Sequence, residues 1–227
     1  MGKLAVVVAL LGGMGLSGLA GAAVIYDNGV VDLTSGARGS DELETPGPGP
    51  RRNADDFVLQ AGGNVVHDVH WWGTYYPDSP LPTDNFTIYI YDDANGLPGV
   101  LISNGAINLG AAVNRTDTGF NLSVPGDINY DVYSYDAVFS ANITLDAGKL
   151  YWLSVVNNVQ PSGWAWSLEF ASGNGAMSTN SGASWETMAD KYAFRLTGDL
   201  SAVPEPATLA LLGLGLAGLG FSRRRSH

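Results

Sequence analysis

Three aromatic residues, Trp72, Tyr75 and Tyr76, are the candidates for contact with a ligand in this sequence. They lie where a predicted strand runs into a proline-rich loop. Exposed aromatic rings can stack on the apolar CH face of a sugar ring. The nearby carboxylates Asp68 and Asp78 could then accept hydrogen bonds from sugar hydroxyls. The pattern indicates carbohydrate contact, and the alternative is that these rings pack in the protein interior.

Histidine offers no metal site. His67 and His70 are three residues apart in the predicted strand 65–72, where alternation points them to opposite faces of a sheet. Val65, His67, Val69 and Trp71 would share one face, and Val66, Asp68, His70 and Trp72 the other. Without a bulge, the two imidazoles cannot bind the same ion.

Carboxylates offer a second metal chemistry, because calcium takes oxygen ligands. The segment 92–96 reads Asp-Asp-Ala-Asn-Gly, but it departs from the Asp-x-Asp-x-Asp-Gly pattern, and Asn-Gly alone explains a tight turn. Two further acidic pairs, Asp55 with Asp56 and Asp127 with Asp131, are no more specific. We therefore predict no cofactor and no metal ligand, and we leave open a structural calcium ion at an unknown site.

No pattern for covalent or zinc-dependent hydrolysis is present. The sequence contains neither Gly-x-Ser-x-Gly nor His-Glu-x-x-His, and it has no cysteine. A pair of convergent carboxylates, as in glycosidases, remains the enzymatic alternative, although nothing distinguishes such a pair here. The prediction is that the protein is not an enzyme.

The charge of the chain is strongly acidic. Residues 24–203 hold seven basic and 21 acidic residues, a net charge of −14. Such a surface repels nucleic acids and anionic membranes, so we expect no nucleic-acid partner.

The C-terminal tail, residues 203–227, combines features of an address and a temporary anchor. It comprises the tetrapeptide Val203, Pro204, Glu205 and Pro206, the apolar run 207–221, and the basic cluster Arg223, Arg224 and Arg225. As a helix, 15 residues span about 22 Å, short of the ~30 Å hydrocarbon core of a bilayer. The arginines are expected on the cytoplasmic side. The prolines keep the tetrapeptide extended, as a processing enzyme requires.

This tail resembles the PEP-CTERM sorting signal of Gram-negative bacteria, which membrane protease-transpeptidases called exosortases recognise. The resemblance implies an exosortase as partner, transient anchoring in the inner membrane, removal of the tail near Pro-Glu-Pro, and delivery to the outer surface or extracellular matrix, with exopolysaccharide as a further partner. An ordinary single-span tail anchor is the alternative.

The N-terminus has the form of a secretory signal peptide. Lys3 precedes an apolar core at residues 4–11, and Ala20-Gly21-Ala22 fits a small-residue cleavage site. We expect residues 1–22 to be removed, with cleavage after Ala22 or Ala23.

The region between the two ends is predicted to be all-β, as a single β-sandwich or jelly-roll-like domain. Glycine, proline, asparagine and aspartate punctuate short alternating segments, and helix-period patterns are scarce. Residues 23–54 are expected to form an opening strand or Asn-Gly hairpin and a Pro/Gly-rich loop, and residues 55–200 the sandwich. The predicted strands are 55–60, 65–72, 86–91, 100–109, 130–141, 149–157, 163–170, 175–179 and 192–197. Tryptophans 71, 152, 164 and 166 are predicted to fill the core.

The body also resembles ectodomains that PEP-CTERM proteins carry. The motifs are Asp55-Asp56-Phe57, Trp71-Trp72-Gly73, Phe86-Thr-Ile-Tyr-Ile-Tyr, Gly96-Leu-Pro-Gly99, Tyr151-Trp-Leu-Ser-Val and Ala193-Phe-Arg-Leu-Thr-Gly198. The resemblance implies a β-sandwich without an assigned activity. The function hypotheses are therefore a structural or adhesive surface protein associated with exopolysaccharide, or a carbohydrate-binding module at the cell surface.

Overall fold

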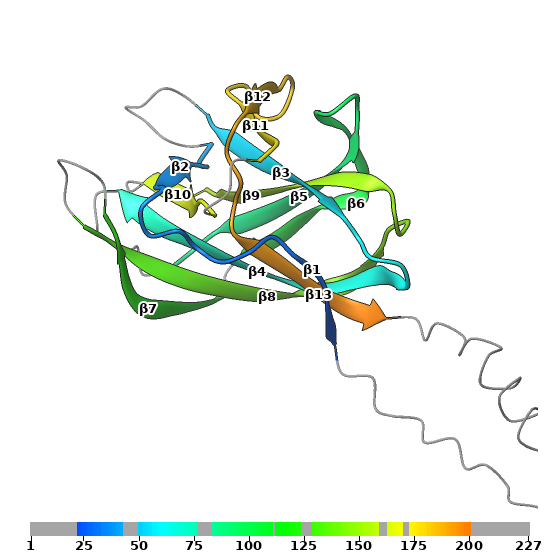
Figure 1. Ribbon diagram of the computed structural model, residues 1–227, viewed down its shortest axis with the longest axis horizontal. Coiled ribbons are helices and arrows are strands. Elements are labelled where there is room, and N and C mark those ends of the chain that lie inside the picture. The colour runs from blue at the N-terminus through cyan, green and yellow to red at the C-terminus, as the bar shows by residue number, and fades with distance from the viewer. Residues whose placement is uncertain are drawn as a thin grey trace, which may run out of the picture.

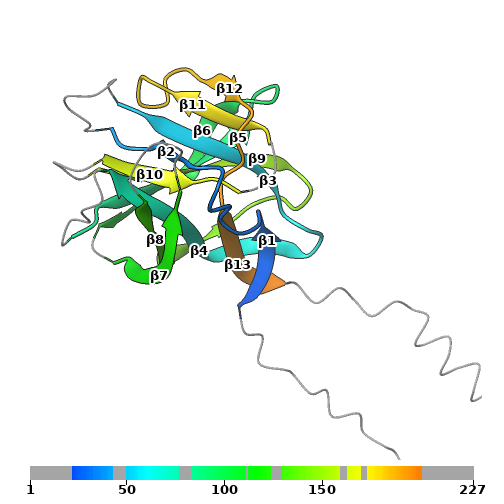
Figure 2. The ribbon, with the colours of Figure 1, turned by 60° about the vertical axis from the view of Figure 1, so that its left-hand side comes forward.

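The computed structural model describes residues 22–42, 50–76, 83–110, 112–123, 129–158, 163–169 and 173–200. This part of the chain is built from two antiparallel sheets and contains no helix, which confirms the all-β prediction. The two layers face each other in Figure 1, and Figure 2 shows them from the side. The signal peptide, apart from Ala22, and the C-terminal sorting tail lie outside the described residues.

The first sheet has seven strands around the long strand β4. They are β1 (Ala23–Asp27), β2 (Ala37–Gly39), β4 (Gly63–Tyr76), β7 (Asn114–Leu122), β8 (Tyr130–Thr144), β10 (Gly163–Ser167) and β13 (Phe194–Leu200). One edge of β4 pairs with β13 and then, toward its C-terminal end, with β10; the other edge pairs with β8. β4 therefore connects both ends of this layer.

The second sheet has six strands in the order β12-β11-β3-β9-β5-β6. They are β3 (Arg52–Val58), β5 (Phe86–Asp93), β6 (Pro98–Gly110), β9 (Leu150–Asn157), β11 (Gly175–Ser178) and β12 (Glu186–Met188). The predicted turn between β5 and β6 is present, with Asn95 at φ 58° and Gly96 at φ 81°. These angles are those of a type I′ turn, whose twist suits a two-residue hairpin.

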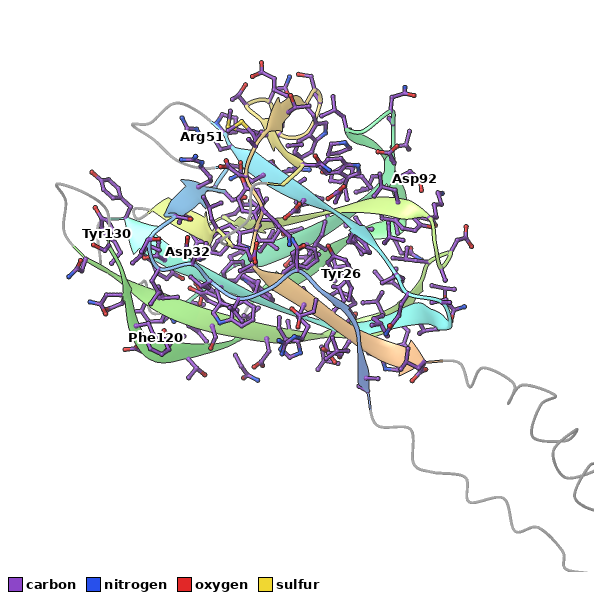
Figure 3. All side chains as sticks on the ribbon, viewed as in Figure 1. Tyr26, Asp32, Arg51, Asp92, Phe120 and Tyr130 are labelled. Atoms are coloured by element: carbon purple, nitrogen blue, oxygen red, sulfur yellow. The ribbon has the colours of Figure 1, made fainter. Side chains whose placement is uncertain are left out.

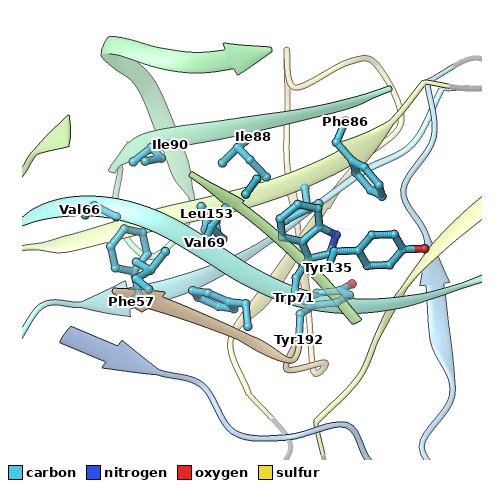
Figure 4. Packing of buried hydrophobic residues seen from close by; sticks show 14 of the residues in the cluster. Phe57, Val66, Val69, Trp71, Phe86, Ile88, Ile90, Tyr135, Leu153 and Tyr192 are labelled. Carbon is cyan, nitrogen blue, oxygen red and sulfur yellow. The ribbon is translucent and has the colours of Figure 1, made fainter. Parts of the chain in front are cut away.

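The core lies between the two sheets, where inward-facing side chains of both layers meet (Figure 4). Val66, Val69 and Trp71 of β4 lie on one side, and Ile88 and Ile90 of β5 on the other. Trp71 stacks on Tyr135 with ring centroids 5.4 Å apart. Because the chain has no cysteine, burial of these large side chains is the main source of stability.

The opening segment contains a strand, β1, as predicted, but not the alternative Asn-Gly hairpin. β1 pairs with β13 near the end of the chain and makes no hairpin at Asn28-Gly29. β2 pairs with β10, and β3 begins at Arg52, so the sandwich includes strands that precede residue 55. β1 and β2 pair with partners distant in sequence, β13 and β10, whereas the mostly exposed β7 and β12 pair with their chain neighbours β8 and β11.

Trp152 is buried, but not in the main core where it was predicted. It packs with Ala54, Tyr91 and Ala176 on the outer face of the second sheet, under the partly buried Trp185. The alternation of β9 explains this position, because Tyr151 and Leu153 on either side of it point into the main core. Trp71, Trp164 and Trp166 do lie in that core.

Candidate binding site

The three predicted contact residues do not share a face of the structure. Trp72 and Tyr76 point outward from β4, whereas Tyr75 points between the sheets and is fully buried. Tyr75 and Tyr76 are consecutive in a strand, so their side chains must lie on opposite faces. Tyr76 alone of the three is largely exposed, at 62%. The structure therefore corrects the prediction that all three rings form one contact platform.

Tyr75 belongs to a buried polar network at one end of the sandwich. Its hydroxyl donates a short hydrogen bond to Asp84 and accepts bonds from Arg115 Nη1 at 3.1 Å and Asn157 Nδ2 at 3.3 Å. Arg115 also pairs with Asp84 at 3.0 Å. Burial, with a further contribution from Asp84, raises the pKa of the Tyr75 hydroxyl well above its ordinary value. Tyr75 therefore links β4 to Asp84, Arg115 and Asn157, and its hydroxyl is engaged within the protein.

Trp72 packs in a small apolar cluster on the outer face of the first sheet, which we call the outer cluster. It is formed by Leu122, Tyr130 and Val132, with Val31, Leu33, Ala37 and Trp72 packed against them. Trp72 is half-buried there. Its ring supports the surface beside Tyr76 and does not stand free.

A hollow opens next to the outer cluster, with a cavity volume of about 270 Å³. We call it the Tyr76 hollow. It is lined by Ala37, Gly39, Arg51, Thr74, Tyr75, Tyr76, Leu122, Tyr130, Gly163, Trp164 and Ala165. The volume is just below the range of about 300–1,000 Å³ typical of small-molecule sites.

Small residues in neighbouring strands create this hollow. Thr74, Ala165 and Gly39 are direct partners across β4, β10 and β2, so they form one row of short side chains. Gly163 is the partner of Tyr76 and leaves the face of that ring uncovered by a side chain. The register of three strands thus places an exposed aromatic ring beside a shallow floor.

Two aromatic rings and one cation border this floor. The rings of Tyr76 and Tyr130 lie 5.8 Å apart at an angle of 53°. Arg51, which directly precedes β3, is the only charged residue of the lining. Figure 3 shows Arg51 and Tyr130 at the same end of the molecule, away from the end where β1 begins and β13 stops. The arrangement offers stacking surfaces, hydroxyl groups and a positive charge, and no carboxylate is among the described residues that line it.

The histidines were predicted on opposite faces, and a β-bulge changes this. The pairing of β4 with β8 shifts register between Val66 and Asp68. As a result, Val66 and Val69 both point into the core, and His67 does not. His67 Nε2 lies 3.0 Å from Asp199 Oδ2, and His70 Nε2 lies 2.8 Å from Asp68 Oδ1. Each imidazole thus has its own carboxylate. Across the described ranges, no group of three His, Cys, Asp or Glu side chains could hold a metal ion.

The acidic turn at residues 92–96 uses its carboxylates within the protein. Asp92 accepts a hydrogen bond from Lys149 Nζ at 2.6 Å. Asp93 Oδ1 accepts bonds from the Gly96 N–H at 3.0 Å and from Trp152 Nε1 at 2.9 Å. These contacts give both residues roles in the turn and in the burial of Trp152.

Asp55 is the most strongly perturbed carboxyl group among the described residues. Its Oδ2 accepts hydrogen bonds from Asn28 Nδ2 and from the Tyr192 N–H, both at 2.6 Å, and its Oδ1 accepts one from the Asp56 N–H at 2.9 Å. Burial raises the pKa of Asp55 to about 7, although the hydrogen bonds act in the opposite direction. It ties β3 to the segments before β13 and after β1, and it does not line the Tyr76 hollow.

Sequence reasoning missed several residues of the hollow: Arg51, Thr74, Tyr130 and Ala165. The spacing Trp72, Thr74, Tyr76 was a signal for one face of a strand, but Tyr130 and Arg51 come from distant segments. The pairing of β10 and β8 with β4 places Ala165 and Tyr130 near Thr74, and the bond from the Arg51 N–H to the Asp41 carbonyl, just after β2, places Arg51 there.

Two family profiles match this chain. The profile described as a domain of unknown function (DUF7901) matches residues 34–193. The profile described as a PEP-CTERM protein-sorting motif matches residues 202–225. No curated protein matches the chain. The second match includes Pro204, Glu205 and Pro206, and it implies export, a C-terminal membrane-anchoring sorting signal and processing by an exosortase. No helix in the described part of the chain has the length and apolar character needed to cross a membrane.

Proposed function

Because the chain belongs to the DUF7901 family and carries a PEP-CTERM sorting motif, we propose that its β-sandwich is a non-enzymatic cargo domain of the cell surface. The domain is delivered to the outer surface or extracellular matrix, where it acts as a structural or adhesive element associated with exopolysaccharide. The single observation that supports this proposal best is the sorting motif placed directly after the last strand. The matched motif begins at residue 202, two positions after Leu200, the last residue of β13.

The geometry of the domain suits a tethered cargo. Ala23 of β1 is the partner of Gly198 of β13, so both ends of the sandwich leave it at the same place (Figure 1). Gly63 of β4 pairs with Leu200, and β4 ends at Tyr76. At about 3.3 Å per residue, this strand separates the tethered end from the Tyr76 hollow by roughly 40 Å. A domain anchored by its tail would therefore present the hollow away from the membrane.

Processing of the tail tests the sorting part of this proposal. The protein should be recovered from the outer surface or matrix without Arg223, Arg224 and Arg225, as intact-mass spectrometry would detect. Replacement of Pro204, Glu205 and Pro206 by alanine should leave the tail attached and keep the protein in the inner membrane. Recovery of the native protein with its arginines at the outer surface would contradict sorting by tail removal.

Carbohydrate binding is the second candidate function, and the Tyr76 hollow favours it. An aromatic ring that is 62% exposed beside a floor of small side chains can stack on a sugar. Binding of cell-surface polysaccharide by the mature protein should depend on Tyr76. Alanine at Phe120 is a matched control, because this ring is 60% exposed on β7 but does not line the hollow. Equal loss of binding in both variants would show that general surface hydrophobicity is responsible.

A further inference from the structure

We infer that the Tyr76 hollow binds a sugar ring that carries an anionic group, such as a carboxylate or sulfate, and that Arg51 pairs with this group. The inference rests on the second candidate function and specifies its ligand class. Two independent features of the structure support it: the shape of the hollow and the positive charge of Arg51 in its lining.

Arg51 differs from every other cation in the described residues. There are seven lysines and arginines in these ranges. Six of them form ion pairs: Arg38, Arg52, Arg115, Lys149, Lys191 and Arg195. Arg51 makes no ion pair with any residue that the structure describes. In a domain where acidic residues outnumber basic ones three to one, this is the position where a negative partner is expected and no described residue supplies one.

The guanidinium of Arg51 is also partly desolvated. Its Nε is buried and has no hydrogen-bond partner. The Arg51 N–H donates to the Asp41 carbonyl at 2.9 Å, which fixes the backbone from which the side chain extends. The cation is therefore positioned before any ligand arrives.

The other lining groups select a ring and not a bare anion. Tyr76 and Tyr130 provide aromatic surfaces, and the row of Thr74, Ala165 and Gly39 leaves room beside them. A cavity of about 270 Å³ suits one sugar residue of a chain, because it is at the small end of ligand sites. Arginine recognises planar carboxylates and sulfates through paired N–H donors, which a neutral sugar cannot match.

The net charge of the domain predicts how binding depends on salt. At −14, the surface repels a polyanion at long range, and this repulsion is screened beyond about 8 Å at physiological ionic strength. Binding of an acidic polysaccharide should thus need moderate salt, while the local pair with Arg51 persists. A neutral polysaccharide should show no such dependence.

The test compares matched ligands by isothermal titration calorimetry with the mature protein recovered from its cells. The ligands are an oligogalacturonate, the same oligomer with its carboxylates reduced to alcohols, and inorganic sulfate alone. The acidic oligomer should bind at least 10-fold more tightly than the reduced one, in line with one charge-assisted hydrogen-bonded pair. Arg51→Ala should remove that difference, and Arg51→Lys should restore part of it.

The control variant is Arg195→Ala, which removes the same charge from β13, where Arg195 pairs with Asp27 and does not line the hollow. It should leave binding unchanged. Equal binding of the acidic and reduced oligomers would overturn the anionic specificity and leave carbohydrate binding standing. Binding of neither oligomer would overturn both. Sulfate binding as tight as that of the oligomer, insensitive to Tyr76→Ala, would identify a plain anion site and overturn the assignment of a sugar.

Discussion

Replacing Asp55 by asparagine should change how the stability of the protein depends on pH. In the folded protein, burial raises the pKa of Asp55 from 3.8 to about 7. The folded state therefore binds this proton more tightly than the unfolded chain does. The stability associated with the neutral carboxyl is fully present below pH 3.8 and is lost as the pH rises through about 7.

The size of the effect follows from the pKa difference. A change from 3.8 to about 7 corresponds to about 4 kcal/mol, at about 1.4 kcal/mol for each pH unit. Between these values, ionisation of Asp55 should lower the free energy of unfolding of the native protein as the pH increases. The Asp55→Asn variant cannot ionise at this position, so its stability should lack this decrease.

The Asp55→Asn variant also loses some stability at every pH. The NH2 group of the new asparagine must face one of the N–H donors that contact the carboxylate in the native protein. These donors are Asn28 Nδ2 and the N–H groups of Tyr192 and Asp56. This cost does not vary with pH. The informative quantity is therefore the difference in unfolding free energy between the two proteins as a function of pH, and not its value at any single pH.

Urea unfolding followed by tryptophan fluorescence from pH 4 to pH 8.5 measures this quantity. The native protein should lose up to about 4 kcal/mol relative to Asp55→Asn across the range. Asp117→Asn removes an exposed carboxylate of β7 and should run parallel to the native protein. A difference that stays flat, or one that grows in favour of the native protein with rising pH, would refute the reasoning. It would mean that three hydrogen bonds outweigh burial and keep Asp55 ionised.

Three further substitutions test the packing and the polar contacts. Gly198→Ala should destabilise the fold by about 3 kcal/mol in thermal unfolding, because its Cβ would lie 1.8 Å from a backbone carbonyl oxygen of β4. Arg115→Ala should cost about 3 kcal/mol by leaving the buried Asp84 without its cation, whereas Arg195→Ala, at an exposed pair, should cost less than about 1 kcal/mol in the same assay. Gly96→Ala should cost about 1 kcal/mol in urea unfolding, because φ of 81° is strained for any residue with a Cβ.

Much of the fold could be read from local patterns. Most of the long strands were predicted within a few residues, since their alternating apolar side chains and the turns between them are local signals. The Asn95-Gly96 turn is an example, because its required φ angles depend on two adjacent residues. β7 and β12 were missed because few of their side chains are buried, so they carry no alternation to detect.

The arrangement of faces was less predictable. A bulge between Val66 and Asp68 moved His67 out of the inward-facing set, and no local signal in the sequence announces it. A bulge is stabilised by the strands on either side, here β8 and β13, which come from segments about 70 and 130 residues away. Alternation applied without the bulge therefore assigns the wrong residues to the core.

The sequence by itself determined the sorting motif and the all-β class, because these depend on composition and on contiguous motifs such as Pro204-Glu205-Pro206. The tertiary structure decided which aromatic residues reach solvent and what surrounds them. Tyr75 and Tyr76 look equivalent in the sequence, yet one is fully buried and the other borders a hollow with Arg51. The physical reason is that strand register across β4, β10 and β2 sets which side chains meet, and register depends on contacts between distant segments.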